Sequence, residues 1–344
     1  MNLPTIHWPH ALACLLVAVT AVLLCFGALV TTYDAAMAVP DWPGTFGHNM
    51  FLYPLKAWLW GPWDLFLEHG HRLLGALVGV LTLGMAAAVW RRETDATIRA
   101  LAIAAVLLVV VQGALGGARV LLDDKTVAKV HACTGPLFFS VAIAIATLTR
   151  PSRATAAARS VVSAASGNNL LRPECWKGVA ALSTAPWVTA GLLMAAYVQL
   201  VAGAQLRHLD AAVDASTFRW MVAFHLAGAL LVSVLSIVAA GTCWWLEAAV
   251  PRRLALVILM LVGCQLLLGA GAWFVSWGFP ADWLPQSWGP TQATLARSAR
   301  GAAVVTGHVV LGMLILGASV VLALSTWALR SLQQPGLGKE RAFA

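Results

Sequence analysis

Four histidines are the residues of this chain whose type and spacing most clearly point to chemistry. His71, His131, His225 and His308 each fall inside a long apolar segment, and a glycine follows each of them three or four residues later. An ionisable side chain in such a segment indicates a functional site. Two imidazoles that face each other can supply both axial ligands of a haem iron, whereas zinc would require cysteine or carboxylate partners as well. We therefore predict two histidine pairs that hold haem iron, with the glycines leaving room for the flat macrocycle.

One carboxylate accompanies these histidines. Glu68 lies three residues before His71, which places the two side chains on one helix face. The matching positions before the other three histidines are apolar: Ala128, Val222 and Val305. Glu68 is therefore either the partner of Arg72 in an ion pair at the helix start, or an acid that moves protons beside one of the two sites.

The composition identifies the elements that must position these side chains. Of 344 residues, 60% are hydrophobic and 10% are charged, whereas a soluble domain carries about 25% charged residues. This excludes a soluble enzyme, a nucleic-acid-binding domain and a disordered tail. Apolar segments of this length predict membrane-spanning helices. Eight are predicted, at residues 11–31, 67–90, 98–121, 127–149, 178–204, 217–246, 254–276 and 301–330.

The charges predict how these spans are oriented. An even number of spans places both termini on one side, and that side carries 13 of the 22 basic residues but only five of the 14 acidic ones. Basic residues accumulate on the cytoplasmic side of membrane proteins. We expect both termini to lie in the cytoplasm, with the histidines near the outer surface.

The two halves of the chain resemble each other. Residues 27–36 match residues 203–212 at five of ten positions, and Gln112 with Gly116 is repeated as Gln265 with Gly269. An Ala/Ser/Arg-rich segment, residues 151–177, separates the halves and is predicted to be a cytoplasmic linker. The predicted fold is an all-α integral membrane protein whose eight transmembrane helices form two pseudo-symmetric four-helix bundles, residues 1–150 and 178–344, each with one histidine pair.

Several further residues have both a structural and a functional interpretation. Basic side chains near the outer helix ends could pair with haem propionates or could extend to the membrane surface, and Arg72 is the first candidate among Arg72, Arg119, Lys129, Arg207, Arg219 and Arg300. The six cysteines form no CxxC motif and are expected to be small buried residues. Many of the 16 tryptophans lie near span ends, as in an interfacial aromatic belt.

With these features in view, the sequence resembles the haem A synthase (CtaA/COX15) family. The resemblance is carried by AMAVPDWPGTFG at residues 36–47, by Glu68-His-Gly-His-Arg72, by QGALGG at residues 112–117 and by the four histidines. Some bacterial members have a cysteine pair in the first outer loop. Residues 32–67 contain no cysteine, so the chain resembles the type that lacks the pair.

This resemblance implies an activity and roles for the residues. Members oxidise a methyl group of haem O to a formyl group, which gives haem A for cytochrome oxidase. His225 and His308 would hold a haem b cofactor, His71 and His131 the substrate haem O, and Glu68 would be catalytic. The resemblance places the protein in the cell inner (cytoplasmic) membrane, among lipid. Its partners would be an unidentified electron donor and, as further candidates, haem O synthase or cytochrome oxidase assembly factors.

Two other classes fit part of the pattern. A di-haem membrane cytochrome b that carries electrons would explain the four histidines, but not Glu68 or the PDWP loop. A transporter with repeated halves would place its site near the middle of the membrane, whereas these histidines lie near one surface. The type of haem extracted from the protein separates the first two classes, and absence of haem would favour the third.

Overall fold

The computed structural model of the chain describes residues 6–150, 173–208, 213–246, 248–277 and 298–332. Within these ranges the regular elements are helices. Their bounds are α1 Trp8–Thr32, α2 Leu55–Leu59, α3 Trp63–Arg92, α4 Ala96–Leu122, α5 Lys125–Leu148, α7 Pro173–Arg207, α8 Ala215–Trp244, α9 Ala249–Trp277 and α10 Ala299–Leu332.

Eight of these helices are long and apolar enough to cross a membrane, which confirms a multi-pass membrane protein. Two details differ from the sequence-based prediction. α7 begins at Pro173, so the last residues of the predicted linker 151–177 are helical, and residues 151–172 lie outside the described ranges. A short helix, α2, interrupts the loop between α1 and α3, which the sequence predicts to be the first outer loop. Its five residues are too few to produce a periodic pattern.

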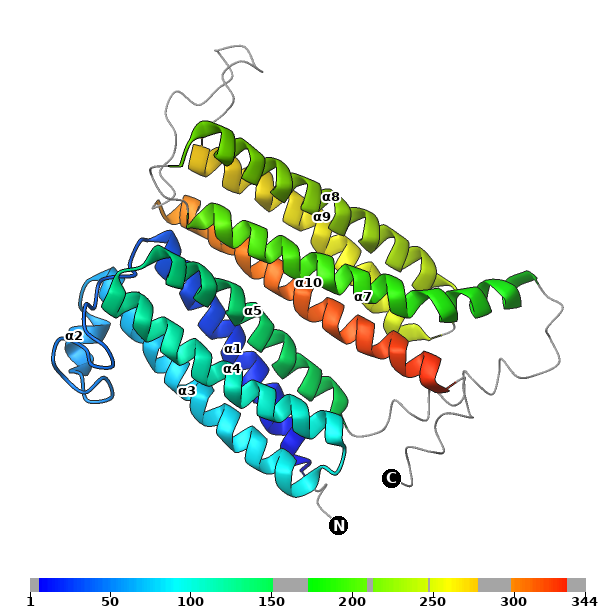
Figure 1. Ribbon diagram of the computed structural model, residues 1–344, viewed down its shortest axis with the longest axis horizontal. Helices are drawn as coiled ribbons and strands as arrows, with labels where there is room; N and C mark the ends of the chain where they lie inside the picture. The colour runs from blue at the N-terminus through cyan, green and yellow to red at the C-terminus, as the bar shows by residue number, and fades with distance from the viewer. Residues whose placement is uncertain (1–5, 151–172, 209–212, 247, 278–297, 333–344) are drawn as a thin grey trace.

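The long helices form two groups that lie side by side (Figure 1). In one group α1 contacts α3 and α5, and α4 closes the ring between them; in the other, α7, α8, α9 and α10 are in contact in the same way. Each group has its own apolar core, with Leu16 and Met85 buried in the first and Leu192 and Leu316 in the second. The arrangement is compatible with the predicted pair of pseudo-symmetric bundles.

The two bundles meet along a seam formed by α1 and α5 on one side and α7 and α10 on the other. Phe139 and Ile143 of α5 pack there against Val320 of α10. Nearer one end the seam is polar, because Arg207 donates hydrogen bonds to the Ala28 carbonyl (3.1 Å) and to the Thr32 hydroxyl (2.8 Å). Specific contacts therefore join the halves.

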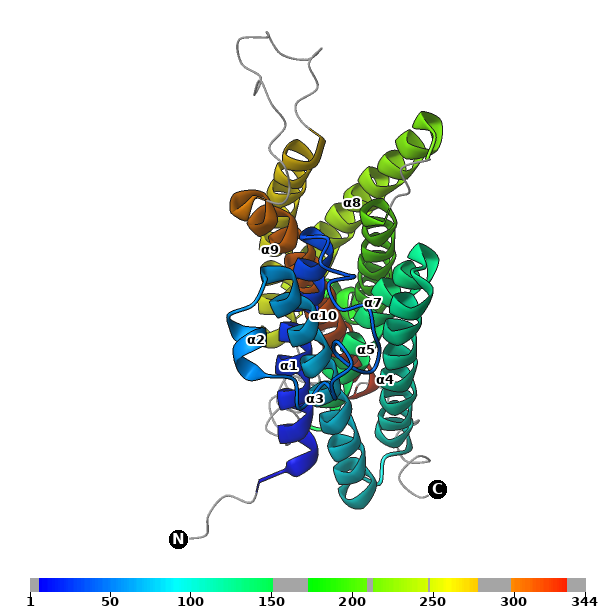
Figure 2. The ribbon, with the colours of Figure 1, turned by 90° about the vertical axis from the view of Figure 1, so that its left-hand side faces the viewer.

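Four of the helices, α3, α5, α8 and α10, begin at the same end of the molecule, which we call the histidine end; the start of α1 and the end of α10 lie at the opposite end (Figure 1). Asp124 and Asp214 cap α5 and α8 there by accepting backbone N–H bonds from the first turn. These hydrogen bonds lower the pKa of both carboxyls. The first outer loop and α2 lie in front of α1 and α3 at this end (Figure 2).

Candidate functional site

The structure brings the four predicted histidines together as two pairs. His71 of α3 faces His131 of α5 with their ring centroids 6.4 Å apart and their planes at 82°. His225 of α8 faces His308 of α10 with the same centroid separation, 6.4 Å, and planes at 65°. Each pair joins the second and fourth spans of its bundle.

This separation fits one metal ion between the two rings. A bond from an imidazole nitrogen to iron or zinc is about 2 Å long, and the nitrogen lies about 1 Å from the ring centre, so two axial imidazoles have centroids about 6 Å apart. The Nδ1 atoms of His71, His131 and His308 are buried and have no hydrogen-bond partner among the described residues. These three nitrogens would lie 3.5–3.8 Å from a β-carbon placed on the glycine of the neighbouring helix, so they are on the side of each ring that is nearer to that helix. Among the described residues, no group of three His, Cys, Asp or Glu side chains that could hold a metal ion is found.

A glycine of the preceding helix packs against each histidine ring. A β-carbon placed on that glycine would lie 3.0–3.4 Å from the Cε1 atom of the ring, which is closer than ordinary packing. The contacts pair Gly27 with His71, Gly116 with His131, Gly203 with His225 and Gly269 with His308. Small residues allow membrane helices to approach closely. Here they also fix how far each ring stands from its neighbouring helix.

A glutamine lies four residues before the contacting glycine at three of the four sites. Gln112 donates from Nε2 to the His131 carbonyl (3.3 Å), and Gln199 donates in the same way to the His225 carbonyl (2.9 Å). The third is Gln265, and the matching position at the His71 site is Leu23. Sequence comparison of the halves paired Gln112 with Gln265 but missed Gln199, although the same spacing before Gly203 could have revealed it.

Below the rings, the packed core begins at the same depth on all four histidine helices. The next buried Val, Ile, Leu or Phe lies seven residues after each histidine: Val78, Phe138, Val232 and Ile315. Seven residues are two turns, or about 10 Å along a helix. Between each histidine and this core, the large aliphatic and aromatic side chains of the four helices are only partly buried or exposed, as expected if a broad flat group such as a haem lies between the rings.

Glu68 is almost fully buried, with 3% of its surface exposed. Its Oε1 accepts a hydrogen bond from Arg72 (2.8 Å), and its Oε2 accepts one from the backbone N–H of Val39 (2.9 Å). The ion pair considered from the sequence is therefore present. The carboxylate also holds the first outer loop, a contact that the sequence did not reveal.

Arg72 is directed to the same loop. It donates to the carbonyls of Asp41 (2.6 Å), Gly44 (2.9 Å) and Val39 (2.7 Å), in addition to Glu68. These bonds use both terminal nitrogens of the guanidinium. The role of Arg72 as a propionate partner stays a prediction, and its contacts explain a different function, which is to fasten the loop.

His69 is a site residue that the sequence reasoning missed. It is 1% exposed, and its Nδ1 lies 3.0 Å from the Thr45 hydroxyl, a hydrogen bond between α3 and the loop. The rings of Tyr53 and Trp58 lie 5.2 and 5.3 Å from its ring. Its position between Glu68 and His71 could have drawn attention to it, but its loop partners are far away in the sequence.

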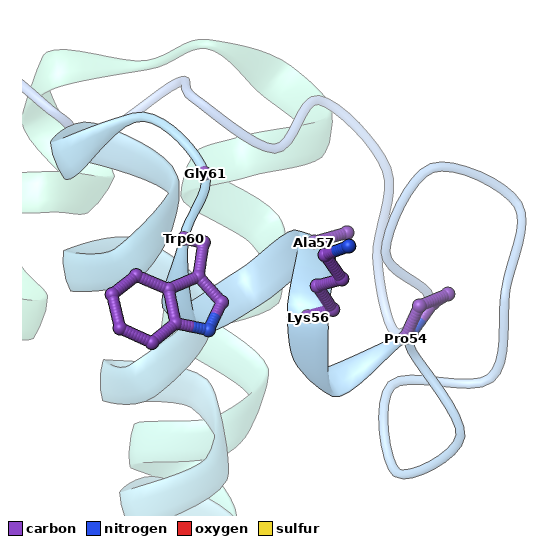
Figure 3. Close-up of a pocket in the computed structure, with 5 residues that line it drawn as sticks. All are labelled: Pro54, Lys56, Ala57, Trp60 and Gly61. Atoms are coloured by element: carbon purple, nitrogen blue, oxygen red, sulfur yellow. The ribbon is translucent and has the colours of Figure 1, made fainter.

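A surface pocket also lies in this loop, lined by Pro54, Lys56, Ala57, Trp60 and Gly61 (Figure 3). Its lining includes one cation and neither a histidine nor a carboxylate. It contains none of the groups that the chemistry above requires, so we place the candidate site at the histidine pairs.

The fold and the site define a class: a multi-pass membrane protein with two similarly spaced histidine pairs near one end of its helices, one of which has a carboxylate three residues before a histidine. Residues 63–228 match the family COX15-CtaA, described as cytochrome oxidase assembly protein. This similarity supports membership of the family. The matched region contains Glu68, Arg72 and three of the four histidines. No curated protein matches the sequence.

Proposed function

We propose that this protein is a haem A synthase, which oxidises a methyl group of haem O to a formyl group. The observation that carries the proposal is the pair of equally spaced histidine sites, 6.4 Å between centroids in each, of which the first has Glu68 three residues before one of its histidines. Similarity to a family of cytochrome oxidase assembly proteins supports it, because haem A is a cofactor of that oxidase.

The two pairs take different roles in this proposal. His71 and His131 hold the substrate haem O, while His225 and His308 hold haem b as the resident cofactor. When bound, haem b would supply electron transfer. The difference in surroundings supports the assignment, because Glu68 and the first outer loop lie at the first pair, and the second pair has a valine at both positions that match Glu68.

The chain's own residues would orient the substrate and handle protons. The two histidines would set the orientation of the substrate plane, whereas its rotation within that plane, which decides where one methyl group points, would be set by contacts at the edge of the ring. Two hydroxylations of that methyl would give a geminal diol, with dioxygen as the oxidant and the unidentified electron donor supplying the electrons that reduce its second oxygen atom to water. Loss of water from the diol would give the formyl group. Glu68, one helical turn from His71 and held by Arg72 and Val39, would take up a proton beside the reacting carbon.

The charge distribution supports a setting for this reaction. Of the 22 basic residues, 13 lie on the side of the termini, which would place both termini in the cytoplasm and the histidine end at the outer face of the inner (cytoplasmic) membrane. The substrate is strongly apolar, so it would arrive through the lipid or from a membrane partner such as haem O synthase. Cytochrome oxidase assembly factors are the candidate recipients of the product.

The experiment that tests the function is chromatography of the haems extracted from purified protein and from cells that supply haem O. We expect haem A when the protein is present, and haem O without haem A when it is absent. Haem B as the only haem, with no haem A under any condition, would instead identify an electron-carrying cytochrome b. That alternative requires the same two pairs but assigns no purpose to Glu68.

A further inference from the structure

The first outer loop is fastened to the bundle at several points. We call residues 36–48 of this loop the cap. Arg72 and Glu68 of α3 hold its backbone at Val39, Asp41 and Gly44. The Asp41 carboxylate in turn accepts the backbone N–H groups of Phe46 (2.8 Å) and Gly47 (2.9 Å), which closes the turn within the cap.

A second helix also holds the cap. Arg119, near the end of α4, donates to the Ala36 carbonyl (2.7 Å). On the α3 side, Thr45 is hydrogen-bonded to the buried His69. The cap is therefore fixed to both α3 and α4, and its place over this end of the bundle is determined by side chains on either side of it.

These contacts place the Trp42 side chain against α4. A β-carbon placed on Gly117 would lie 2.6–2.9 Å from three atoms of the Trp42 indole, so the ring rests directly on the glycine backbone. The adjacent glycine, Gly116, is the one that packs against His131. Trp42 thus lies next to the helix segment that sets the position of one histidine of the first pair, while 42% of its surface remains exposed.

In the described part of the second half, no glycine makes an equivalent contact with a tryptophan. Aligning Gln112 and Gly116 with Gln265 and Gly269 matches Gly117 with Ala270, whose β-carbon would occupy the space that the indole needs. The four histidine–glycine contacts are repeated in both halves, but the contact between tryptophan and glycine belongs to the first pair. The contact between Trp42 and Gly117 is therefore one of the differences between the two histidine sites.

We propose that Trp42 is a positioning residue of the first histidine site, where its indole forms the outer wall and packs against the edge of the substrate porphyrin. This inference rests on the proposed function, which assigns haem O to that site. Aromatic faces pack well against flat conjugated rings, and the exposed part of the indole is available for this contact. Glu68 and Arg72 hold the cap in the position that makes it possible.

The test compares two glycine substitutions on the same helix. Gly117→Ala places a methyl group against Trp42, whereas Gly113→Ala meets nothing within 4 Å and serves as the matched control. With haem O supplied as the probe, we expect Gly117→Ala to raise the KM about tenfold, with kcat within about twofold. Haem O retained at the first pair should fall in parallel, while haem b at the second pair stays at the wild-type amount and reports an intact fold.

Substitutions of the tryptophan complete the test. Trp42→Ala should behave like Gly117→Ala, and Trp42→Phe should recover most of the haem O binding. The proposal is overturned if Gly117→Ala and Trp42→Ala retain haem O as the wild type does, or if both lose haem b to the same extent as haem O. A wild-type protein that binds haem O but produces no haem A would contradict the proposed function instead, while the binding comparison would still test Trp42.

Discussion

At the scale of single residues, the two histidine pairs have the same separation and different surroundings. A glycine packs on every ring, but only His71 has a carboxylate one turn away. Glu68 is held by Arg72 and by the Val39 N–H, so its oxygens have defined positions. A group held in this way can act at one atom of a bound substrate, and its removal should affect the reaction more than the binding.

Replacing Glu68 by glutamine tests this distinction. The substitution keeps the shape of the side chain and removes the charge and the proton-accepting oxygen. We expect haem A formation to fall by about a hundredfold or more, while the amounts of bound haem stay within about twofold of the wild type. Haem A output is measured in cells that supply haem O. Glu93→Gln removes a carboxylate that pairs with His7 at the opposite end and is the control; normal haem A output from Glu68→Gln would rule out the role.

Asp41 makes the cap sensitive to acid. Burial alone would raise the pKa of this carboxyl, but the N–H groups of Gly47 and Phe46 and the charge of Arg72 outweigh it and hold the pKa below its ordinary value of 3.8. Because the folded state favours the ionised form, the stabilisation is present above the ordinary pKa and is lost as the pH falls through the lowered one.

Hydrogen exchange of cap peptides, corrected for intrinsic exchange, tests whether the cap loses stability as the pH falls. Protection should be constant from about pH 8 to about pH 5 and should fall only below about pH 4. Asp41→Asn should be less protected throughout and show no acid step. A variant whose protection follows that of the wild type at every pH would contradict the role of the carboxylate.

At the scale of the elements, each histidine helix is paired with a preceding helix through a glycine. The pairs are α1 with α3, α4 with α5, α7 with α8 and α9 with α10. Close approach at the glycine sets the ring position, and the core that begins seven residues further in keeps the helices from shifting. Enlarging one of these glycines should therefore displace a ring without unfolding the bundle.

The α9 helix offers a matched comparison for this effect. A β-carbon at Gly269 would lie 3.0 Å from His308 Cε1, whereas at Gly263 it would meet nothing within 4 Å. Gly269→Val should lower the haem b content about fivefold or more, and Gly263→Val, which has the same intrinsic effect on the helix, should retain it. Haem is quantified per protein by extraction. Equal haem content in the two variants would show that the glycine does not set the ring position.

At the scale of the whole molecule, two similar bundles share a specific seam and differ at one end. Arg207 of α7 reaches Ala28, the neighbour of the glycine that contacts His71, and Thr32 of α1 lies 3.2 Å from Thr306 of α10. Contacts across the seam thus end close to both histidine sites. The cap adds a tryptophan and a carboxylate network to the first bundle.

Much of this could be predicted from the sequence, for identifiable reasons. The uninterrupted apolar segments predicted the membrane spans. The four histidines, at similar positions in two repeated halves, predicted two pairs, and the structure has one pair of facing rings in each bundle. The short helix α2, the anchor at His69 and the seat of Trp42 on Gly117 were not predicted. All three features belong to an irregular loop that packs against residues far away in the sequence, and neither hydrophobic periodicity nor residue spacing predicts such contacts.

The most direct test of the central claim is to identify the haem that each pair holds. Protein is purified from cells that make haem O, and its haems are extracted and chromatographed for the wild type, His71→Ala and His225→Ala. We expect His225→Ala to lose haem B, and His71→Ala to lose haem O or haem A while keeping haem B. Haem B alone in the wild type, lost in part by each variant, would contradict the account.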